Sequence, residues 1–367
     1  MKARITALVS ASAIAMTALS GAAYAEPSEE LIAAAKQEGT LTVIALPHDW
    51  CNYGGMIEGF KAKYGLAVNE LNPNASSGDE IEAVKANKGN TGPQAPDVLD
   101  LGLSFGPAAK AEGLLAPYKV STWDTIPDDA KDAEGYWYGD YYGVIAFGVN
   151  KSIIDTSPED WADLLKDEYA SAVALAGDPR TANNAILGVY ASGLAAGGAD
   201  AAGAAQAGVD FFKQLNEKGN FVPVDAEAAP IAQGTTPIAI NWDYNLLAVR
   251  DQLDGNPEIE IIVPTSGVVA GVYVQAISAH APHPNAAKLW MEYLYSDEGQ
   301  LHWLKGYCHP IRFNDMAERG VIPQELLDAL PPAEAYEDAA FPSLAEQEVF
   351  KADIAKLWND VIGVEVK

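Results

Sequence analysis

Short apolar runs alternate with amphipathic segments through the first hundred residues of the chain. The apolar runs predict three strands, at residues 40–46, 66–71 and 97–101. The segments between them have helical spacing, and Ser28 and Gly39 are placed to begin and to end a helix ahead of the first strand. A repeated strand–loop–helix unit of this kind predicts a parallel sheet with helices on its faces.

A second series of the same units follows a cluster of tyrosine, tryptophan and glycine at residues 135–142. The pattern predicts further strands at residues 144–149, 172–176, 236–240, 259–263 and 271–275. Helices are predicted over residues 158–165, after the turn at 178–181 and over 285–294. The Ala/Gly-rich stretch 193–208 is interpreted as two helices joined by a turn, and the C-terminal region as polar helices.

The first 25 residues have the pattern of a signal peptide. Lys2 and Arg4 precede an apolar stretch over residues 5–19, and Ala23-Tyr24-Ala25 forms a small-x-small cleavage site. No later segment has the roughly 18 uninterrupted apolar residues of a membrane-spanning helix, and no lipid-attachment cysteine follows the cleavage site. We therefore expect a free protein that is secreted across the inner membrane into the periplasm.

The chain is strongly acidic, because 51 Asp and Glu residues stand against 23 Lys and Arg residues and give a net charge of -28. This balance argues against a basic face for nucleic acid or an anionic membrane. A hydrophobic content of 49% and aromatic residues throughout argue against disorder. A length of 367 residues allows two or three domains.

Two cysteines, Cys51 and Cys308, lie far apart in the mature chain. In an oxidising compartment an isolated pair favours a disulfide, with two small buried hydrophobic residues as the alternative. His48 beside Cys51 also allows a Cys/His nucleophile, but the P-loop, G-x-S-x-G and H-E-x-x-H motifs of enzymes are absent from the sequence. The closely spaced His280 and His283 flank a loop and not one helix face, so we expect neither a metal nor a cofactor.

Polar and aromatic residues follow the predicted strands, at the strand ends where open α/β sheets bind ligands. We expect ligand contacts from these loops in both halves and from the strand at 271–275. The candidate residues are Asp49, Trp50, Asn52, Tyr53, Ser77, Ser104, Phe105, Thr181, Trp242, Asp243, Tyr244 and Tyr273. Core positions for the tryptophans and helix N-caps for the two serines are the alternative interpretation.

Several short segments occur in a recognisable order and spacing. They are ELIAAAKQEG at 30–39, PDVLD at 96–100, GLLAPY at 113–118, WADLL at 161–165, GDPR at 177–180 and APHPNAA at 281–287. In this, essentially the whole mature chain resembles the extracellular solute-binding proteins of ABC importers, in the family of polyamine, ferric-ion and thiamine or phosphonate binders. The resemblance implies a two-lobed α/β periplasmic-binding-protein fold (type II-like), each lobe a mixed sheet flanked by helices, that closes on its solute about crossing strands.

The resemblance also implies a division of the chain and a set of partners. The expected parts are the signal peptide 1–25, lobe 1 over 26–147, lobe 2 over 148–272, and a segment 273–367 that returns to lobe 1 and ends in helices packed on the lobes and the hinge. Strands near 144–149 and 273–277 would cross between the lobes. The expected partners are a small-molecule solute and an ABC permease in the inner membrane. We expect a monomer and no nucleic acid.

The residues leave the chemistry of the solute open. Aromatic rings beside carboxylates, such as Trp50 beside Asp49, suit an ammonium group and favour a polyamine or an amino-acid-like amine such as γ-aminobutyrate. Asp243 is the expected carboxylate of the second lobe, where it would form a charge-assisted hydrogen bond with the amine. Serines and Thr181 ahead of helix N-termini instead favour a phosphonate or sugar-phosphate anion. Ferric binders of the family have two adjacent tyrosines where this chain has Asp243-Tyr244, so ferric ion is a weaker alternative, and a secreted enzyme is the alternative from another class.

Overall fold

The computed structural model describes residues 26–330 and 338–367, so the predicted signal peptide lies outside the described residues. Helices and strands alternate through the N-terminal third, as the hydrophobic pattern predicts. The elements are α1 (Glu29–Glu38), β1 (Thr40–Ile44), α2 (Tyr53–Tyr64), β2 (Ala67–Leu71), α3 (Ser77–Ala86), β3 (Val98–Gly102), α4 (Phe105–Ala111), β4 (Leu115–Ala116) and the short 3-10 helices η1 (Trp123–Thr125) and η2 (Asp128–Ala130).

Local sequence signals set the ends of the first helices. The Ser28 side chain accepts the N–H of Leu31 at 3.2 Å, and Gly39 ends α1 with a φ of 76°, which residues with a β-carbon rarely adopt. Ser76 and Asp79 form a capping box at the start of α3, each side chain accepting the other's backbone N–H. The predicted beginning and end of α1 are therefore confirmed.

The remaining elements begin with a long strand. They are β5 (Trp137–Asn150), η3 (Trp161–Leu165), η4 (Asp167–Tyr169), β6 (Val173–Leu175), α5 (Asn183–Ala195), α6 (Ala201–Lys218), α7 (Ala228–Gln233), β7 (Ile238–Trp242), α8 (Asp243–Leu253), β8 (Ile259–Ile262), β9 (Ala270–Ser278), α9 (Pro284–Leu294), α10 (Asp297–Lys305), β10 (His309–Pro310), α11 (Phe313–Glu318), α12 (Gln324–Asp328), α13 (Leu344–Leu357) and the π-helical turn η6 (Trp358–Ile362). Over the parts of the chain that the structure describes, none of these helices combines the length and the apolarity needed to cross a membrane.

Three predicted elements differ from the structure. The predicted strand at 144–149 is only the second half of β5, because the aromatic residues before it are themselves buried and paired in the sheet. The predicted helix at 158–165 is reduced to the 3-10 helix η3. The strand expected at 236–240 is β7, which ends at Trp242, so this tryptophan lies in the strand and not in the loop after it.

The strands form a mixed sheet system and not the parallel sheet expected from the alternation alone. β1 pairs with β2 and β6 pairs with β7 in parallel. All pairs that involve β5 or β9 are antiparallel, and these two strands connect the remainder in the order β3-β9-β5-β7-β6. The first half of β5, up to Val144, pairs with β9, and from Ile145 onward it pairs with β7 and β8. β5 therefore belongs to two sets of strands along its length.

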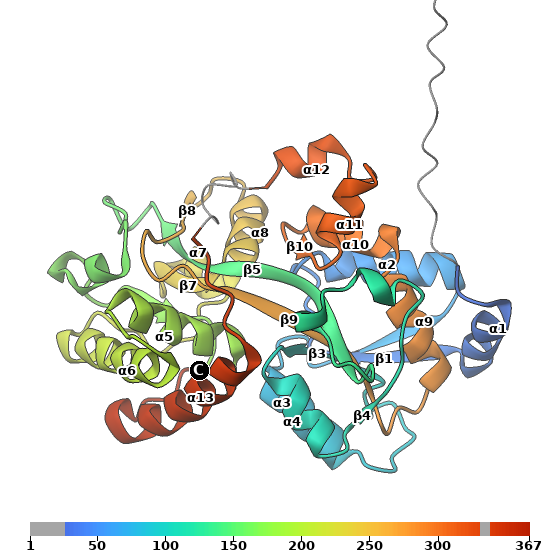
Figure 1. Cartoon of the computed structure of the whole chain (residues 1–367). Coiled ribbons are helices and arrows are strands. Elements are labelled where there is room, and N and C mark those ends of the chain that lie inside the picture. The colour runs from blue at the N-terminus through green and yellow to red at the C-terminus, as the bar shows by residue number, and fades with distance from the viewer. Residues whose placement is uncertain (1–25, 331–337) are drawn as a thin grey trace, which may run out of the picture.

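The elements gather into two bodies joined by β5 and β9 (Figure 1). We call them the N-terminal lobe, which contains β1–β4, α1–α4, α9 and α10, and the C-terminal lobe, which contains β6–β8 and α5–α8. The last helix, α13, packs against α5 and α6 of the C-terminal lobe. The expected boundaries at residues 147 and 272 stay a prediction.

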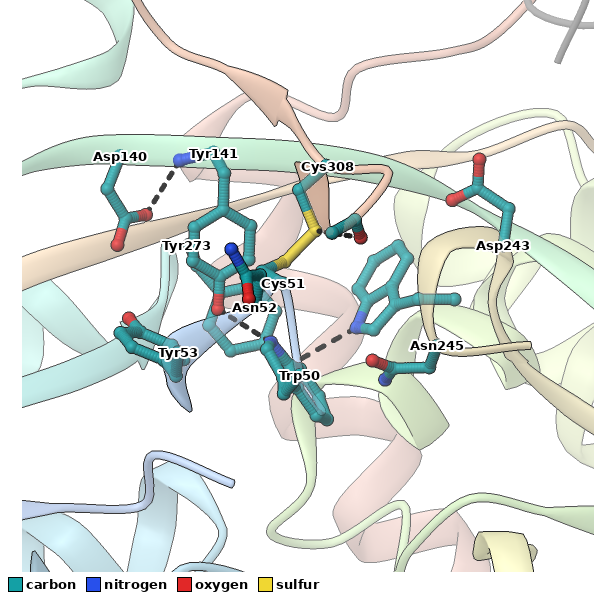
Figure 2. The surroundings of a disulfide bond; sticks show 12 residues. Trp50, Cys51, Asn52, Tyr53, Asp140, Tyr141, Asp243, Asn245, Tyr273 and Cys308 are labelled. Atoms are coloured by element: carbon teal, nitrogen blue, oxygen red, sulfur yellow. Dashed lines mark hydrogen bonds between the residues drawn. A yellow bond between two sulfur atoms is a disulfide. The ribbon is translucent and has the colours of Figure 1, made fainter. Parts of the chain in front are cut away.

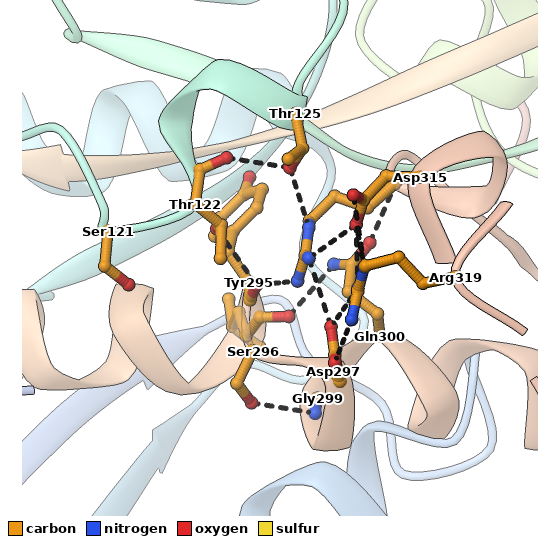
Figure 3. Close-up of polar contacts among 12 residues, drawn as sticks. Ser121, Thr122, Thr125, Tyr295, Ser296, Asp297, Gly299, Gln300, Asp315 and Arg319 are labelled. Atoms are coloured by element: carbon orange, nitrogen blue, oxygen red, sulfur yellow. Dashed lines mark hydrogen bonds and ion pairs between the residues drawn. The ribbon is translucent and has the colours of Figure 1, made fainter. Parts of the chain in front are cut away.

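A network of polar contacts joins the helices that follow β9 (Figure 3). The guanidinium of Arg312 is 0% exposed and pairs with Asp297 at 3.0 Å and with Asp315 at 2.7 Å. Its Nε also donates to Thr125 Oγ1 at 2.8 Å, and its Nη1 donates to the carbonyl of Tyr295 at 2.5 Å. Because each of the three guanidinium nitrogens has a partner, the charge is tolerated away from water, and the network connects η1 to α10 and α11.

Candidate functional site

A cavity of about 450 Å³ is lined by residues of both lobes. The N-terminal lobe contributes the loop after β1, the loop before α3, the first turn of α3, and β3. The C-terminal lobe contributes the loop between β6 and α5, the start of α7, the end of β7 and one face of α8. These are mainly loops at strand ends and helix starts, which is where ligands bind in α/β proteins.

Aromatic rings form one side of the cavity next to the disulfide (Figure 2). The indole Nε1 of Trp50 donates to the hydroxyl of Tyr141 at 2.7 Å, and that hydroxyl donates to Asp100 Oδ2 at 2.7 Å. Tyr273 stacks on Tyr141 with ring centroids 5.4 Å apart and meets Trp50 edge-on at 5.5 Å. Trp50 and Tyr273 both line the cavity, so their positions are fixed by ring contacts and hydrogen bonds before any solute arrives.

The predicted disulfide between Cys51 and Cys308 is confirmed. It holds the loop after β1 against the segment just before β10, and β10 pairs with Tyr141 and Tyr142 of β5. Cys51 and Asn52 have positive φ angles of 47° and 61°, so the loop turns sharply at the bridge. The disulfide therefore connects the cavity residues Asp49 and Trp50 to the strand that joins the two lobes.

Three carboxyl groups are buried at this side of the cavity: Glu80 and Asp100 line it, and Asp140 does not. Glu80 is 1% exposed, Asp100 3% and Asp140 0%. Burial raises the pKa of Asp100 to about 7, although hydrogen bonds from tyrosines and Gln275 oppose the shift. Burial and the neighbouring Asp100 raise the pKa values of Glu80 and Asp140 well above their usual range. In this cluster, burial therefore favours the protonated, neutral form of the three carboxyl groups.

The charges that face the cavity are of one sign. Among the residues that the structure describes, the lining includes seven carboxyl side chains and no lysine, arginine or histidine; the carboxyls are those of Asp49, Asp79, Glu80, Asp100, Asp178, Asp225 and Glu227. The nearby Arg180 is engaged by Asp178 through hydrogen bonds of 2.8 and 2.5 Å. Burial, with a contribution from Glu227, raises the pKa of Asp225 to about 6. The lining is therefore acidic on both walls of the cavity, although burial favours the protonated form of Glu80, Asp100 and Asp225.

Amide side chains complete the wall of the C-terminal lobe. Asn183 and Asn184 begin α5, and Asn241 and Asn245 come from the end of β7 and the first turn of α8. Asn184 Nδ2 donates to Asn241 Oδ1 at 3.2 Å, and the same oxygen accepts the N–H of Trp242 at 2.8 Å. Since amides both donate and accept, this wall can bind neutral polar atoms of a solute.

The structure brings together five of the predicted ligand-binding residues. Asp49, Trp50, Ser77, Thr181 and Tyr273 line the cavity. The Ser77 hydroxyl accepts the N–H of Gly102 at 3.0 Å, so it also connects α3 to β3. No bound solute is part of the structure, and their contacts with one stay a prediction.

The other predicted residues do not line this cavity; they are Asn52, Tyr53, Ser104, Phe105, Trp242, Asp243 and Tyr244. Asn52 turns to α10, where its Nδ2 donates to the carbonyl of His302 at 3.3 Å. Tyr53, Trp242 and Tyr244 are at most 1% exposed and pack in the aromatic core behind the wall. Ser104 and Phe105 are buried at the start of α4. Trp242 therefore lies in the core, which is the alternative that the sequence left open for the tryptophans.

Asp243 occupies a structural position and not a cavity position. Its side chain is 0% exposed, and Oδ1 accepts the backbone N–H of Val144 in β5 at 3.0 Å. In Figure 2 it lies apart from Trp50 and Tyr273, at the start of α8. The side chain bonds to the crossing strand, because it is the first residue of a helix that packs on β5. Its expected role as the ligand carboxylate of the second lobe stays a prediction.

Sequence reasoning missed the carboxyls and amides that dominate the wall. Glu80 and Asp100 were obscured because one lies in a helix and the other inside an apolar strand, and neither follows a strand end. Asn183 is the first residue of α5 and Asp225 lies in the loop before α7, and the alternation pattern gives no signal at either position. Asp100, inside the apolar run DVLDL at 97–101, is the one signal in the sequence for this cluster, since an unpaired charge inside a buried strand is costly.

No group of three or more His, Cys, Asp or Glu side chains within residues 26–330 and 338–367 has the arrangement of a metal site. Tyr141 and Tyr142 are adjacent in the sequence, but they do not form a pair of hydroxyl groups that faces the cavity. Tyr141 is buried against Asp100 and Trp50, and Tyr142 stacks on His309 with ring centroids 5.0 Å apart. These contacts direct the two hydroxyl-bearing rings to opposite sides of β5.

Known proteins resemble this chain in sequence and in fold. A family model described as bacterial extracellular solute-binding protein matches residues 94–332. A probable ABC transporter periplasmic-binding protein of Sinorhizobium fredii is 26% identical over 226 residues. That match covers 60% of this chain and 60% of the relative, so the chain spans about three-fifths of the length of the curated relative.

Two solved structures show how far the likeness in fold extends. The periplasmic binding protein AfuA from Actinobacillus pleuropneumoniae, with fructose-6-phosphate bound, has a TM-score of 0.65 and 22% identity and covers 88% of this chain and 98% of its own. The binding protein AgtB from A. tumefacien R10, in complex with agropinic acid, has a TM-score of 0.70 and 14% identity and covers 89% of this chain and 99% of its own. At these identities the likeness concerns the fold alone.

Proposed function

Because the chain belongs to the family of bacterial extracellular solute-binding proteins, we propose that it serves an ABC importer as the solute-binding component and that it captures a small amine-bearing solute. The family and the periplasmic-binding-protein fold that the sequence predicts are both confirmed. Binding proteins of this family take part in transport, and we propose that this chain performs no catalysis. Its protein partner would be the permease of the importer in the inner membrane.

Location and movement follow from the same proposal. The predicted signal peptide at residues 1–25 would direct the chain to the periplasm, where a monomer would diffuse between solute and permease. The lobes would rotate about β5 and β9. β5 pairs with β7 of the C-terminal lobe and with β9, and β9 also pairs with β3 of the N-terminal lobe. Support for this comes from the cavity, since its walls belong to different lobes and change distance when the lobes rotate.

The observation that carries the solute class is the charge of the cavity. Within residues 26–330 and 338–367, seven carboxyl side chains line it together with Trp50 and Tyr273, and no cationic side chain does. A cationic amine would be attracted by the carboxylates and by the faces of the rings. A phosphonate or a sugar phosphate would bring further negative charge into a partly buried anionic space, where like charges repel strongly.

The helix N-terminus next to the cavity does not favour an anion either. Asp79 accepts the N–H of Ser76, and Ser76 accepts the N–H of Asp79, so α3 satisfies these donors with its own side chains. A carboxylate already occupies the position near the helix dipole that an anionic solute would take. This weakens the anion alternative, for which serines ahead of helices were the sequence argument.

Thermal unfolding of the mature protein with a panel of solutes tests the proposal. The panel contains 1,4-diaminobutane, 4-aminobutyrate, 2-aminoethylphosphonate, inorganic phosphate and ferric citrate. A ligand at 100 times its Kd adds about 2.7 kcal/mol to the unfolding free energy, so amines should raise the melting temperature measurably. Stabilisation by phosphate or ferric ion, with none by either amine, would contradict the proposed solute class. Recovery of the amine unchanged after incubation checks that binding and not turnover is observed.

A further inference from the structure

Glu80 and Asp100 form the floor of the cavity on the side of the N-terminal lobe. Glu80 Oε2 accepts the backbone N–H of Asp100 at 2.8 Å, which fixes the carboxyl group of α3 against β3. The other oxygen, Oε1, is buried and has no hydrogen-bond partner among the described residues. A buried carboxylate oxygen without a donor is costly, and a donor supplied by a solute would remove that cost.

The carboxyl group of Asp100 is held in place beside Glu80. Its Oδ2 accepts the hydroxyl of Tyr141 at 2.7 Å, and its Oδ1 accepts Nε2 of Gln275 at 3.1 Å. Tyr141 is in turn held by the indole N–H of Trp50, whose ring lines the cavity. The floor is therefore arranged in advance, and a solute that binds there reorganises little.

We propose that Glu80 and Asp100 form a subsite for a primary ammonium group, with Glu80 Oε1 as the acceptor that lacks a donor in the free protein. This rests on the proposed function and adds to it the position of the amine and its class. An ammonium group with N–H bonds can donate to Glu80 and Asp100 while the rings of Trp50 and Tyr273 contact its methylene groups and its charge. A quaternary ammonium has no N–H to donate to either carboxyl group.

Entry of the ammonium group is linked to loss of a proton from the floor. Without solute, burial favours the neutral form of these acids, and the bound cation favours the anion. The proton leaves to solvent as the ammonium replaces it. The charged and titratable groups that face Glu80 and Asp100 are Asp79 of α3, Tyr53 of α2, Asp140 and Tyr141 of β5, Tyr244 of α8, Tyr273 of β9 and Tyr295 after α9. None of these groups carries a positive charge, so the cation that pairs with the floor would come from the solute.

Calorimetric titration of three proteins tests the subsite: the wild type, Glu80→Gln and Glu82→Gln. Glu82 lies in the same helix, is exposed and pairs with Lys85, and it does not line the cavity, so its variant is the matched control for lost charge. The probes are 1,4-diaminobutane, 4-aminobutyrate and the fully methylated counterpart of the diamine. Titrations are repeated in two buffers of different ionisation enthalpy, which reports the protons released.

We expect Glu80→Gln to weaken both primary amines by about 30-fold or more, and Glu82→Gln to change binding less than about twofold. The methylated diamine should bind the wild type far more weakly than the diamine. Binding to the wild type near pH 6.5 should release protons, and less so in Glu80→Gln. Thermal unfolding without solute shows that the variant folds, because its amide oxygen can still accept the N–H of Asp100 and an unsatisfied acid is gone.

Equal affinity and equal proton release in wild type and Glu80→Gln would overturn the subsite while leaving the proposed function in place. Equal binding of the methylated and the primary diamine would overturn the role of N–H donation in the same way. If neither primary amine bound the wild type, the proposed solute class and the subsite would fall together. The three results are distinguishable, because only the last removes binding from the unmodified protein.

Discussion

At the scale of single residues, burial assigns different roles to carboxylates that look equivalent in the sequence. Asp243 is fully buried and its Oδ1 accepts a backbone N–H of β5, whereas Glu80 is equally buried but keeps one oxygen without a donor at the cavity. The first group is satisfied within the protein and the second is not. A hydrogen-bond donor on a solute would therefore stabilise the carboxyl group of Glu80 more than that of Asp243.

Asp243→Ala should lower the unfolding free energy by about 1–3 kcal/mol, because the N–H of Val144 loses its acceptor in a buried position. Solute affinity should change little, since Asp243 does not line the cavity. Urea unfolding and calorimetric titration measure the two quantities. Asp243→Asn keeps an acceptor oxygen and should lose less stability, which serves as the control. A large loss of affinity at unchanged stability would return Asp243 to the binding site.

The pKa of Asp100, raised to about 7 by burial, makes the stability of the solute-free protein depend on pH. The folded protein holds this proton more tightly than the unfolded chain, where an aspartate has a pKa near 3.9. Stability should therefore fall as pH rises from about 4 to about 7, by up to about 1.4 kcal/mol per pH unit for one group. Urea unfolding of wild type and Asp100→Asn at pH 5 and 7.5 isolates this contribution. The variant should gain on the wild type as pH rises; a constant difference would show that the carboxyl does not titrate in this range.

At the scale of elements, the site depends on connections between segments that are distant in sequence. The disulfide joins the loop after β1 to the residue before β10 across 257 positions, and Arg312 joins η1 to α10 and α11. Both connections lie in the N-terminal lobe, behind or beside the wall that Trp50 and Asp100 form. The helices and strands form the framework of the lobe, and the disulfide and Arg312 attach the loop after β1 and the 3-10 helix η1 to it.

A Cys51→Ser/Cys308→Ser variant should be less stable by about 2–5 kcal/mol, because the unfolded chain is no longer constrained. It should also bind solute more weakly, since the loop with Asp49 and Trp50 loses its attachment next to β10. Urea unfolding and calorimetric titration report the two effects. Reductant should weaken the wild type and leave the double variant unchanged. Unchanged affinity in the variant would mean that the hydrogen bond from Trp50 to Tyr141 positions the loop alone.

Arg312→Met should destabilise the protein by about 3–5 kcal/mol, because Asp297 and Asp315 lose a buried partner. Arg319 pairs with the same two aspartates but is 15% exposed, so Arg319→Met should cost less. Thermal unfolding in the absence of solute ranks the two variants. Binding of the solute should be retained in both, since neither arginine lines the cavity. A larger loss for Arg319→Met would contradict the assignment of Arg312 as the centre of the network.

At the scale of the whole molecule, the two lobes meet at small residues. A β-carbon on Gly102, at the end of β3, would overlap the side chain of Asn183 at the start of α5. A β-carbon on Gly78 would lie 3.3 Å from the β-carbon of Thr181, which is a tight but tolerable contact. Both glycines belong to the N-terminal lobe and both neighbours to the C-terminal lobe. Their small size allows the walls of the cavity to approach each other.

Gly102→Ala should hinder this approach and weaken solute binding, with about tenfold in Kd for each 1.4 kcal/mol of strain. Gly78→Ala should have a smaller effect in the same direction. Small-angle scattering with saturating solute should give a larger radius of gyration for Gly102→Ala than for wild type, while the melting temperature of the solute-free protein stays close to that of the wild type. Equal scattering and equal affinity would show that Asn183 moves aside at little cost.

How much of this protein its sequence alone determines depends on the range of the interactions involved. The ends of α1, the strands β1–β3 and the helix–turn–helix of α5 and α6 follow from caps, glycines and hydrophobic spacing, which act between residues near in sequence. The family is predicted in the same way, from short segments in a recognisable order. Five of the twelve expected ligand residues line the cavity, because loops that follow strands form much of its wall.

The tertiary structure alone decides which polar groups are satisfied and which remain open to a solute. Asp243 and Glu80 are both acidic residues in the first turns of helices, and nothing local distinguishes them. Asp243 accepts the N–H of a crossing strand, whereas Glu80 lines the cavity and keeps one oxygen without a donor, because strands and helices from distant parts of the chain pack next to them. Hydrogen-bond partners of buried groups are set by such long-range packing, whereas helix ends and strand periodicity are set by neighbours along the chain.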